Sequence, residues 1–326
     1  MLAMFKILRS LIVVSRPEFL LAMASWFIIG LSWSLNQPTD LALGLLVPAT
    51  LSFAIVMLNA AIGLQINNIF DYDLDRKDIH KKPLVQAMES LGVGRLKLFM
   101  TIEFLFSLAF IFLLGITQGK PALLLMWIVG VFLAYAYSAP PVRLKSRCWM
   151  SLGLLLLIIC ILPALFVYYV FTYELNPLFL LFLAGQSMSV YSLVLSTEIR
   201  DYFEDKAMNV GTMTVRLGLD KASFSSIVLL GAGGLLTITA FFLELFFTLH
   251  PTLNIFLLVI AIADYAILKR LKKLHSLSRE YMTSKDQDFT AEEIKRFSEN
   301  STQWIALASQ ATVFMSIVLL VNRFLP

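Results

Sequence analysis

The sequence has few charged residues, few cysteines and few histidines. Asp, Glu, Lys and Arg make up 15% of the 326 residues, against about 25% in ordinary soluble domains. Two cysteines, Cys148 and Cys160, and three histidines without ligand-like spacing exclude a disulfide scaffold and a zinc site. Hydrophobic residues make up 59%, which excludes a disordered chain and an ordinary cytosolic enzyme. An integral membrane protein remains, and its net charge of +4 calls for a membrane explanation before a nucleic-acid partner.

Long apolar runs divide the chain into predicted spans, since about 20 apolar residues cross a bilayer. The expected fold class is all-α, an integral membrane bundle of nine transmembrane helices. Residues 1–326 are expected to form a single polytopic domain, with a polar cytoplasmic insertion at about 269–302 that is either a solvated helix or a flexible loop. The nine runs lie at 17–35, 43–66, 98–117, 120–138, 150–172, 177–197, 223–247, 252–268 and 303–324.

The basic residues fall almost entirely on one side of these spans. Of the 26 Lys and Arg residues, all but Lys120 and Arg323 lie in the N-terminal segment or in alternate loops. Because loops rich in Lys and Arg stay in the cytoplasm, this side is predicted to be cytoplasmic. The protein is therefore expected in the cell membrane, with cytoplasmic loops at 66–97, 138–149, 198–222 and 269–302.

Acidic and amide residues recur every three or four positions where two predicted spans reach this side. That spacing keeps the side chains on one face of a helix. Like charges so close together repel, so a compensating cation is expected. A set of oxygen ligands favours Mg²⁺, Ca²⁺ or Mn²⁺ over zinc. Mg²⁺ typically takes a few carboxylates and lets phosphate oxygens complete its shell, so two such sets predict a Mg²⁺–diphosphate site. The residues are Asn67, Asp71 and Asp75 on the first span, and Glu198, Asp201 and Asp205 on the second.

Basic residues near the same helix ends can neutralise a diphosphate. Arg binds phosphate through two parallel hydrogen bonds, and Lys supplies a point charge. The same residues also fit simple positive-inside sorting, so both interpretations stay open. They are Arg143, Lys145 and Arg147 after the Pro140-Pro141 turn, Lys82 before Pro83, and Arg16 before Pro17.

At these residues the chain resembles the UbiA superfamily of intramembrane prenyltransferases, from Arg16-Pro17 through the last span. Four elements of that family occur in order on the predicted helices. Asn68 stands where many members carry Asp, and the insertion before the last span is longer than expected. The elements are N-x₃-D-x₃-D at Asn67, Asp71 and Asp75; basic-Pro-Leu at Lys82-Pro83-Leu84; the loop Tyr137 through Lys145; and acid-x₂-D-x₃-D at Glu198, Asp201 and Asp205.

The resemblance implies an enzyme that transfers a polyprenyl group from a prenyl diphosphate to a lipophilic acceptor and releases diphosphate. The acceptor class stays open among aromatic compounds, quinone precursors, lipids and pigments. Two Mg²⁺ ions are expected, and no nucleic acid or obligate protein partner is expected. The implied metal ligands are Asn67, Asp71, Asp75, Glu198, Asp201 and Asp205, of which Asp71, Asp75, Asp201 and Asp205 are the expected catalytic residues. The implied diphosphate contacts are Arg16, Lys82, Tyr137, Arg143 and Lys145.

Two other functions remain open at this stage. A UbiA-related terpene cyclase would use the donor's own double bond as acceptor and yield a cyclised hydrocarbon without added acceptor. An ion-coupled transporter is less favoured, because transporter sites lie near the bilayer midplane and these acids lie at helix ends. A phospholipid head-group transferase would need a D-x₂-D-G-x₂-A-R core, which the sequence lacks.

Overall fold

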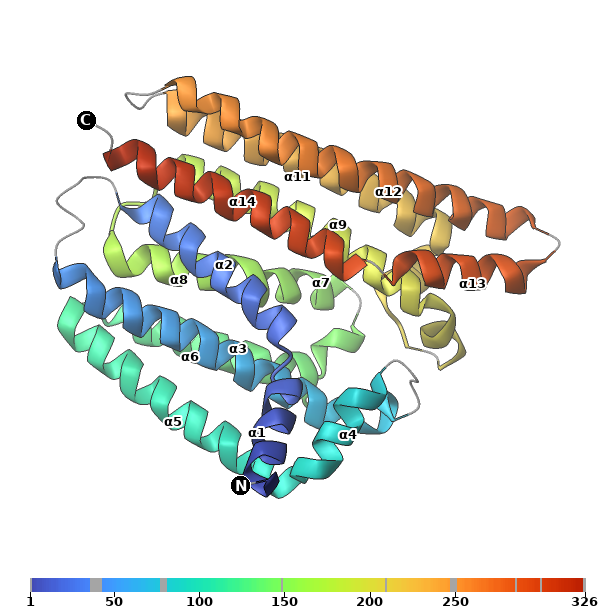
Figure 1. Cartoon of the computed structure of the whole chain (residues 1–326), viewed down its shortest axis with the longest axis horizontal. Helices are drawn as coiled ribbons and strands as arrows, with labels where there is room; N and C mark the ends of the chain where they lie inside the picture. Colours follow the sequence, from blue (N-terminus) through green and yellow to red (C-terminus); the bar gives the residue numbers. More distant parts are fainter. Residues whose placement is uncertain are drawn as a thin grey trace. The chain divides into compact units, whose positions relative to one another are not determined.

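A computed structural model describes residues 2–35, 43–76, 81–147, 149–208, 210–246, 251–284, 286–299 and 301–324 (Figure 1). Across these ranges the regular structure is helical without a single strand, which confirms the predicted all-α class. The helices are α1 (Leu2–Val14), α2 (Pro17–Ser34), α3 (Leu46–Asp75), α4 (Lys82–Leu91), α5 (Val93–Gln118), α6 (Ala122–Ser138), α7 (Trp149–Leu156), α8 (Leu162–Phe171), α9 (Pro177–Ala207), α10 (Met213–Leu217), α11 (Leu219–Phe246), α12 (Leu258–Thr283), α13 (Gln287–Ser298) and α14 (Ser301–Phe324).

The helices belong to two compact units, and each unit is described by itself. Unit 1 contains α1 to α6 and α8, and unit 2 contains α7 and α9 to α14. The border falls within one helical stretch, where a π-helical segment, η5 (Leu157–Ile161), joins α7 to α8. The single polytopic domain stays a prediction.

Seven of the described helices are long and apolar enough to cross a membrane. An eighth span is obtained if residues 7–14 and 19–34, which meet at an angle of 61°, are counted together. Helix α6 is apolar but shorter, with 17 residues. The predicted runs fall on these helices, and the chain is an integral membrane protein, but the count of nine spans is not confirmed.

Unit 1 is built around α3, which packs against α2, α5, α6 and α8 (Figure 1). Buried side chains such as Ile55 and Ile111 form its apolar core. A polar chain also crosses this interior. The indole of Trp127 donates a hydrogen bond to Ser107 Oγ, which donates in turn to Asn59 Oδ1, both at 2.8 Å. These polar groups are therefore satisfied within an apolar bundle, as burial requires.

Lys120 closes the end of unit 1 opposite the acidic residues. It follows α5, is 4% exposed, and donates to the carbonyl oxygens of Tyr169 and Val170 at 2.7 and 2.9 Å. These carbonyls belong to the last turn of α8, where a cation satisfies otherwise unpaired acceptors. This lysine, an exception to the basic asymmetry, therefore has a structural role.

Unit 2 is held together by a close approach of α9 and α11. A Cβ atom on Gly185 would stand 2.8 Å from the carbonyl oxygen of Gly233 and from the backbone nitrogen of Thr237, nearer than real Cβ atoms come. Glycine at this position therefore sets the distance between the two helices, as small residues do in membrane bundles.

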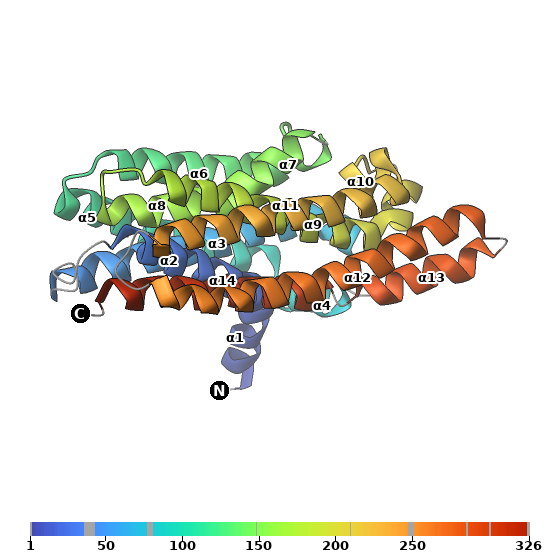
Figure 2. The same ribbon diagram turned by 90° about the horizontal axis from the view of Figure 1, so that it is seen from above.

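The predicted polar insertion is helical. Its first part continues α12 to Thr283, and its second part is α13, which folds back along α12 (Figure 2). Asp286 caps α13 by accepting a hydrogen bond from the backbone nitrogen of Phe289 at 3.1 Å. Of the two predicted states of the insertion, the described residues show the helix.

Candidate active site

The first acidic motif occupies the final turns of α3. Asn67, Asp71 and Asp75 follow one another at four-residue steps, so they share one face of the helix. Asn67 Oδ1 accepts a hydrogen bond at 3.0 Å from the hydroxyl of Ser138, the last residue of α6. The structure therefore joins this motif to the end of α6, where the predicted diphosphate loop begins.

Cations from loops of the same unit lie beside the two aspartates. Lys81 Nζ is 2.7 Å from Asp75 Oδ1, and Arg143 Nη2 is 3.3 Å from Asp71 Oδ1. Asp75 is 5% exposed at its side chain and Asp71 is 15% exposed, so both carboxylates need such compensation. The structure thus brings together Asp71 and Arg143, which the sequence singled out, and adds Lys81.

Lys81, the neighbour of the predicted Lys82, makes the contact with the motif, and the role of Lys82 at the diphosphate stays a prediction. Lys82 begins α4, where Pro83 follows it, and its side chain is exposed. The two lysines are adjacent in the sequence, so the pattern identified the segment but not the side chain that turns toward Asp75.

Two predicted diphosphate residues have left-handed backbones. Arg16 has φ 50°, between α1 and α2, and Arg143 has φ 35°, after the diproline turn. Residues other than glycine adopt this region at a cost, and such strain concentrates at ligand sites. The guanidinium of Arg16 lies 4.3 Å from the ring centroid of Phe19. Arg16 therefore sits at the mouth of α2, as the sequence places it, and Tyr137 is half-buried near the end of α6.

The second acidic motif occupies the final turns of α9, in unit 2. Asp201 takes a two-point contact from Arg200, at 2.7 Å from Nε and 3.0 Å from Nη2. Asp205 is half-buried one turn further on. Lys145, in a short 3₁₀ turn before α7, belongs to the same unit.

Glu198 has a structural partner that its motif position did not predict. Its Oε2 accepts hydrogen bonds from the backbone nitrogen of Thr214 at 3.0 Å and from the hydroxyl of Thr214 at 3.1 Å. These groups begin α10, the short helix in the tail of the second motif. Glu198 thus fixes this helix to α9, whereas its predicted role as a metal ligand stays a prediction.

The oxygen donors of the two ends fit Mg²⁺. Within the described ranges, no three His, Cys, Asp or Glu side chains stand close enough to hold a metal ion by themselves. Mg²⁺ usually takes one or two carboxylates and completes its shell with phosphate oxygens and water. Each acidic end supplies such a partial set. Because the two ends belong to different units, their union in one site is a proposal.

Two carboxylates lie within the apolar helices, away from the motifs. Glu103 on α5 accepts a hydrogen bond from Gln65 of α3 at 2.8 Å. Asp264 on α12 lies against Gly234 of α11, where a Cβ atom would overlap its carboxylate. Hydropathy did not single out Asp264, because the apolar run around it tolerates one acid. Intramembrane acids of this kind usually face the protein interior, and both do so here.

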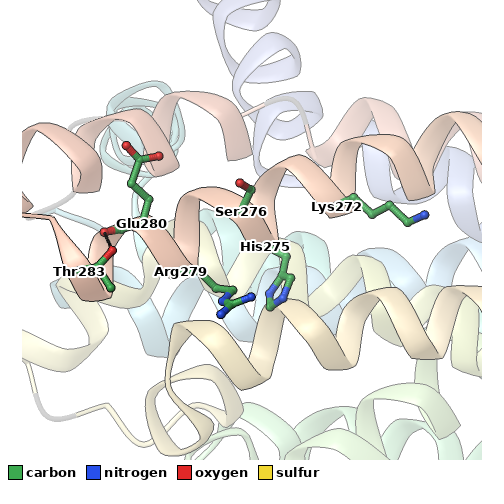
Figure 3. A pocket seen from close by; sticks show the side chains of 6 residues that line it. All are labelled: Lys272, His275, Ser276, Arg279, Glu280 and Thr283. Atoms are coloured by element: carbon green, nitrogen blue, oxygen red, sulfur yellow. Dashed lines mark hydrogen bonds between the residues drawn. The ribbon is translucent and has the colours of Figure 1, made fainter.

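A cleft of about 390 Å³ lies along the charged half of α12 (Figure 3). The side chains of His275 and Arg279 project side by side from α12 into this cleft. Asp220 Oδ1 of α11 lies 3.7 Å from His275 Nδ1 and 4.0 Å from Arg279 Nε. Glu280 and Lys272 also line the cleft. The lining contains no residue of either acidic motif, so the cleft is not assigned to the active site.

The fold and the long apolar helices define an all-helical integral membrane protein. The model of the UbiA prenyltransferase family matches residues 18–284. The chain therefore belongs to the UbiA prenyltransferase family, and it is a prenyltransferase. This confirms the resemblance found in its motifs.

Known relatives agree with this assignment. The lycopene elongase/hydratase of Halobacterium salinarum is 29% identical over 219 residues, which cover 66% of this chain and 73% of that protein. A digeranylgeranylglyceryl phosphate synthase structure covers 96% of this chain and 99% of its own, with a TM-score of 0.63 and 17% identity. A UbiA homologue from Archaeoglobus fulgidus, bound to GPP and Mg²⁺, covers 92% and 99%, with a TM-score of 0.60 and 18% identity. The structural likenesses establish the fold.

Proposed function

We propose that this enzyme transfers a polyprenyl group from a prenyl diphosphate to a lipophilic acceptor, with Mg²⁺, at a site built from both acidic helix ends. The observation that carries the proposal is the pairing of Asp71 and Asp75 with cations that can also bind a diphosphate. The Archaeoglobus relative, whose structure contains GPP and Mg²⁺, supports the choice of donor and metal.

Mg²⁺, when bound, supplies positive charge that stabilises the diphosphate as it leaves. Asp71 and Asp75 would hold it from α3, with Asn67 beside them, and Asp201 and Asp205 would hold it from α9. Two ions are proposed, held by these carboxylates. Arg143 and Lys145 would hydrogen-bond to the diphosphate oxygens and neutralise the charge that develops there.

The reaction breaks the allylic C–O bond of the donor, and the bonding electron pair leaves with the diphosphate. The acceptor supplies an electron pair for the new bond, and for an alkene acceptor a proton is then lost from the adjacent carbon. The apolar helices exclude water, which would otherwise capture the allylic cation. A dry interior next to a charged rim therefore suits this chemistry.

The acceptor we favour is a hydrophobic isoprenoid pigment. The relative named lycopene elongase/hydratase supports this choice, since lycopene is a polyene hydrocarbon without polar groups. Such an acceptor enters from the bilayer, so it needs apolar lining and no dedicated polar pocket. The site would open toward the cytoplasm of a plasma-membrane protein, as the basic asymmetry predicts.

Mass spectrometry of the products tests this function. Purified protein would receive Mg²⁺, geranylgeranyl diphosphate and a panel of acceptors that includes lycopene, an aromatic acid and a glycerol lipid. We expect prenylated lycopene, and no product when EDTA replaces Mg²⁺. A cyclised hydrocarbon formed without acceptor would instead identify a terpene cyclase, and full activity in EDTA would contradict the metal requirement.

A further inference from the structure

The α12–α13 hairpin packs against the end of α9 that carries the second acidic motif. Ile199 of α9, Leu274 of α12 and Ile294 of α13 are each 0% exposed and belong to one apolar cluster. Tyr202 of α9 and Leu277 of α12 complete the contact. The insertion is therefore joined to the acidic end of α9 through a buried core.

Polar and aromatic contacts extend this core to the protein surface. Lys295 Nζ of α13 is 3.0 Å from Glu204 Oε1 of α9. The ring of Phe203, also on α9, meets the ring of Tyr281 on α12 edge to face, with centroids 5.2 Å apart. Successive residues of α9 thus contact both arms of the hairpin.

The hairpin leaves the acidic face of α9 open. At 100° per residue, Asp201 and Asp205 lie about 60° and 20° from Glu198 on one side, and Ile199 and Phe203 lie about 100° and 140° away on the other. Tyr202 and Glu204, about 40° and −120° from Glu198, border the acidic face on its two sides. The hairpin therefore contacts α9 around the acidic arc but not within it, which leaves Asp201 and Asp205 available to a metal.

This end of α9 needs outside support. The helix has 31 residues, which span about 46 Å against a hydrocarbon thickness of about 30 Å. Its last turns therefore extend beyond the bilayer, where neighbouring carboxylates repel one another and weaken the helix. Without the hairpin, the acids would have to be ordered each time a metal binds.

We propose that the α12–α13 hairpin is a clamp that fixes the acidic end of α9 before metal and donor bind, with Glu204 and Lys295 as positioning residues. The proposal rests on the proposed function, because the clamp affects turnover only if Asp201 and Asp205 hold the metal–diphosphate. A site whose ligands are already ordered binds its metal at lower concentration.

Hydrogen exchange measures the clamp without any chemistry. Ile294→Ala should raise the exchange of backbone amides in residues 199–207 by at least about tenfold, from the usual cost of such a cavity. The control is Ile267→Ala. Ile267 lies on α12 and, like Ile294, is 0% exposed, but it belongs to a different cluster, with Leu193 and Trp304. It should destabilise the protein similarly while changing exchange at 199–207 by less than about twofold. Unchanged exchange in folded Ile294→Ala would overturn the clamp.

Charge exchange across the Glu204–Lys295 pair tests its effect on the metal. Lys295→Glu and Glu204→Lys should each raise the Mg²⁺ concentration for half-maximal activity by about two- to fivefold, as expected for a half-exposed ion pair. The double exchange should restore it to within about 1.5-fold of the original protein. A simple field effect predicts otherwise, since added negative charge in Lys295→Glu would lower the Mg²⁺ requirement.

The two failures can be told apart. If the unaltered protein turns over without Mg²⁺, the proposed function fails, whereas the hydrogen-exchange result still decides whether the hairpin orders α9. If Mg²⁺ is required but the double exchange does not restore the requirement, the positioning role of Glu204 and Lys295 is refuted and the proposed function stands.

Discussion

The two acidic helix ends are neutralised in different ways. At the end of α3, Lys81 and Arg143 come from loops and lie beside Asp75 and Asp71. At the end of α9, the cation beside Asp201 is its own neighbour, Arg200, on the same helix. Loop cations can turn from a carboxylate to a diphosphate when a metal replaces them. The first end is therefore suited to exchange partners during binding.

The two ends also differ in what braces them. The end of α3 is joined to α1 by Asn68, which is fully buried and donates a hydrogen bond to the carbonyl of Val14 at 2.7 Å. Met88 of α4 packs in the same region. The end of α9 is braced by an apolar core and the Glu204–Lys295 pair. Both sets of supporting contacts lie outside the acidic faces, so different segments of the chain hold the two acidic helix ends in place.

The largest expected effect is the loss of a central carboxylate at either end. Asp71→Asn and Asp201→Asn should each lower Mg²⁺-dependent turnover by at least about a hundredfold. Asn keeps the size and one oxygen but loses the charge that holds the metal. The double variant should be little worse than either single one, because residues that act as a unit are not additive.

Asp73→Asn is the matched control for these variants. Asp73 is exposed and lies two residues from Asp71, on another face of α3. It should keep nearly full activity. Independent, multiplicative losses at Asp71 and Asp201 in steady-state assays would break the idea that the two ends serve one site.

The next effect concerns the loop cation at the first end. Arg143→Ala should raise the KM for the prenyl diphosphate by roughly 10- to 150-fold, the worth of a charged hydrogen bond of about 1.5–3 kcal/mol. The KM for the acceptor should change much less. Arg95→Ala removes an exposed charge from the first turn of α5 and serves as control. Unchanged donor kinetics in folded Arg143→Ala would mean that Arg143 does not bind the diphosphate and serves only to orient the chain in the membrane.

Substitutions of Glu198 can distinguish a role in metal binding from a role in holding the start of α10 at the second end. A glutamine keeps a carbonyl oxygen that can accept both hydrogen bonds from Thr214, whereas an alanine removes them. If capping is the main role, Glu198→Gln should stay within about threefold of full activity, while Glu198→Ala loses roughly 0.5–2 kcal/mol of stability. Turnover and thermal unfolding of both variants decide this. A loss in Glu198→Gln as large as in Asp201→Asn would make Glu198 a metal ligand.

A further effect, on stability and not on turnover, is expected at the contact between Asn68 and α1. Asn68→Asp replaces the amide donor with an acceptor that faces the carbonyl of Val14, and it should cost about 1–3 kcal/mol of stability. Asn68→Gln is a useful partner variant, since it keeps the donor on a longer side chain. Thermal unfolding in detergent would measure the stability of both variants. Equal stability of Asn68→Asp and the unaltered protein would show that this hydrogen bond does not stabilise the end of α3.

Much of the fold could be predicted from the sequence, because apolar runs and basic loops are properties of whole segments and do not depend on any single side-chain contact. The predicted run 177–197 lies within α9, yet that helix continues ten residues further, through charged turns that hydropathy excludes. The packing of α13 against those turns compensates for their polarity. A window of local hydropathy cannot register a contact between segments about 90 residues apart.

The acidic faces were predictable for a similar reason, since helical spacing alone places Asn67, Asp71 and Asp75 together. The partners were not. Lys81 lies beyond the end of α3, and Thr214 follows Glu198 by 16 residues, so loop geometry decides both contacts. The structure also accounts for a departure from the family pattern, because the amide of Asn68 donates to the carbonyl of Val14, whereas an ionised aspartate has no proton to donate.

The most direct test of the account is an electron cryomicroscopy structure of the protein with Mg²⁺ and an unreactive prenyl thiodiphosphate. The account predicts that Asp71 and Asp201 both contact metal ions on the same diphosphate. It also predicts that Arg143 has moved from Asp71 to a diphosphate oxygen. A diphosphate held by one acidic end alone, with the other motif facing away, would contradict the shared site.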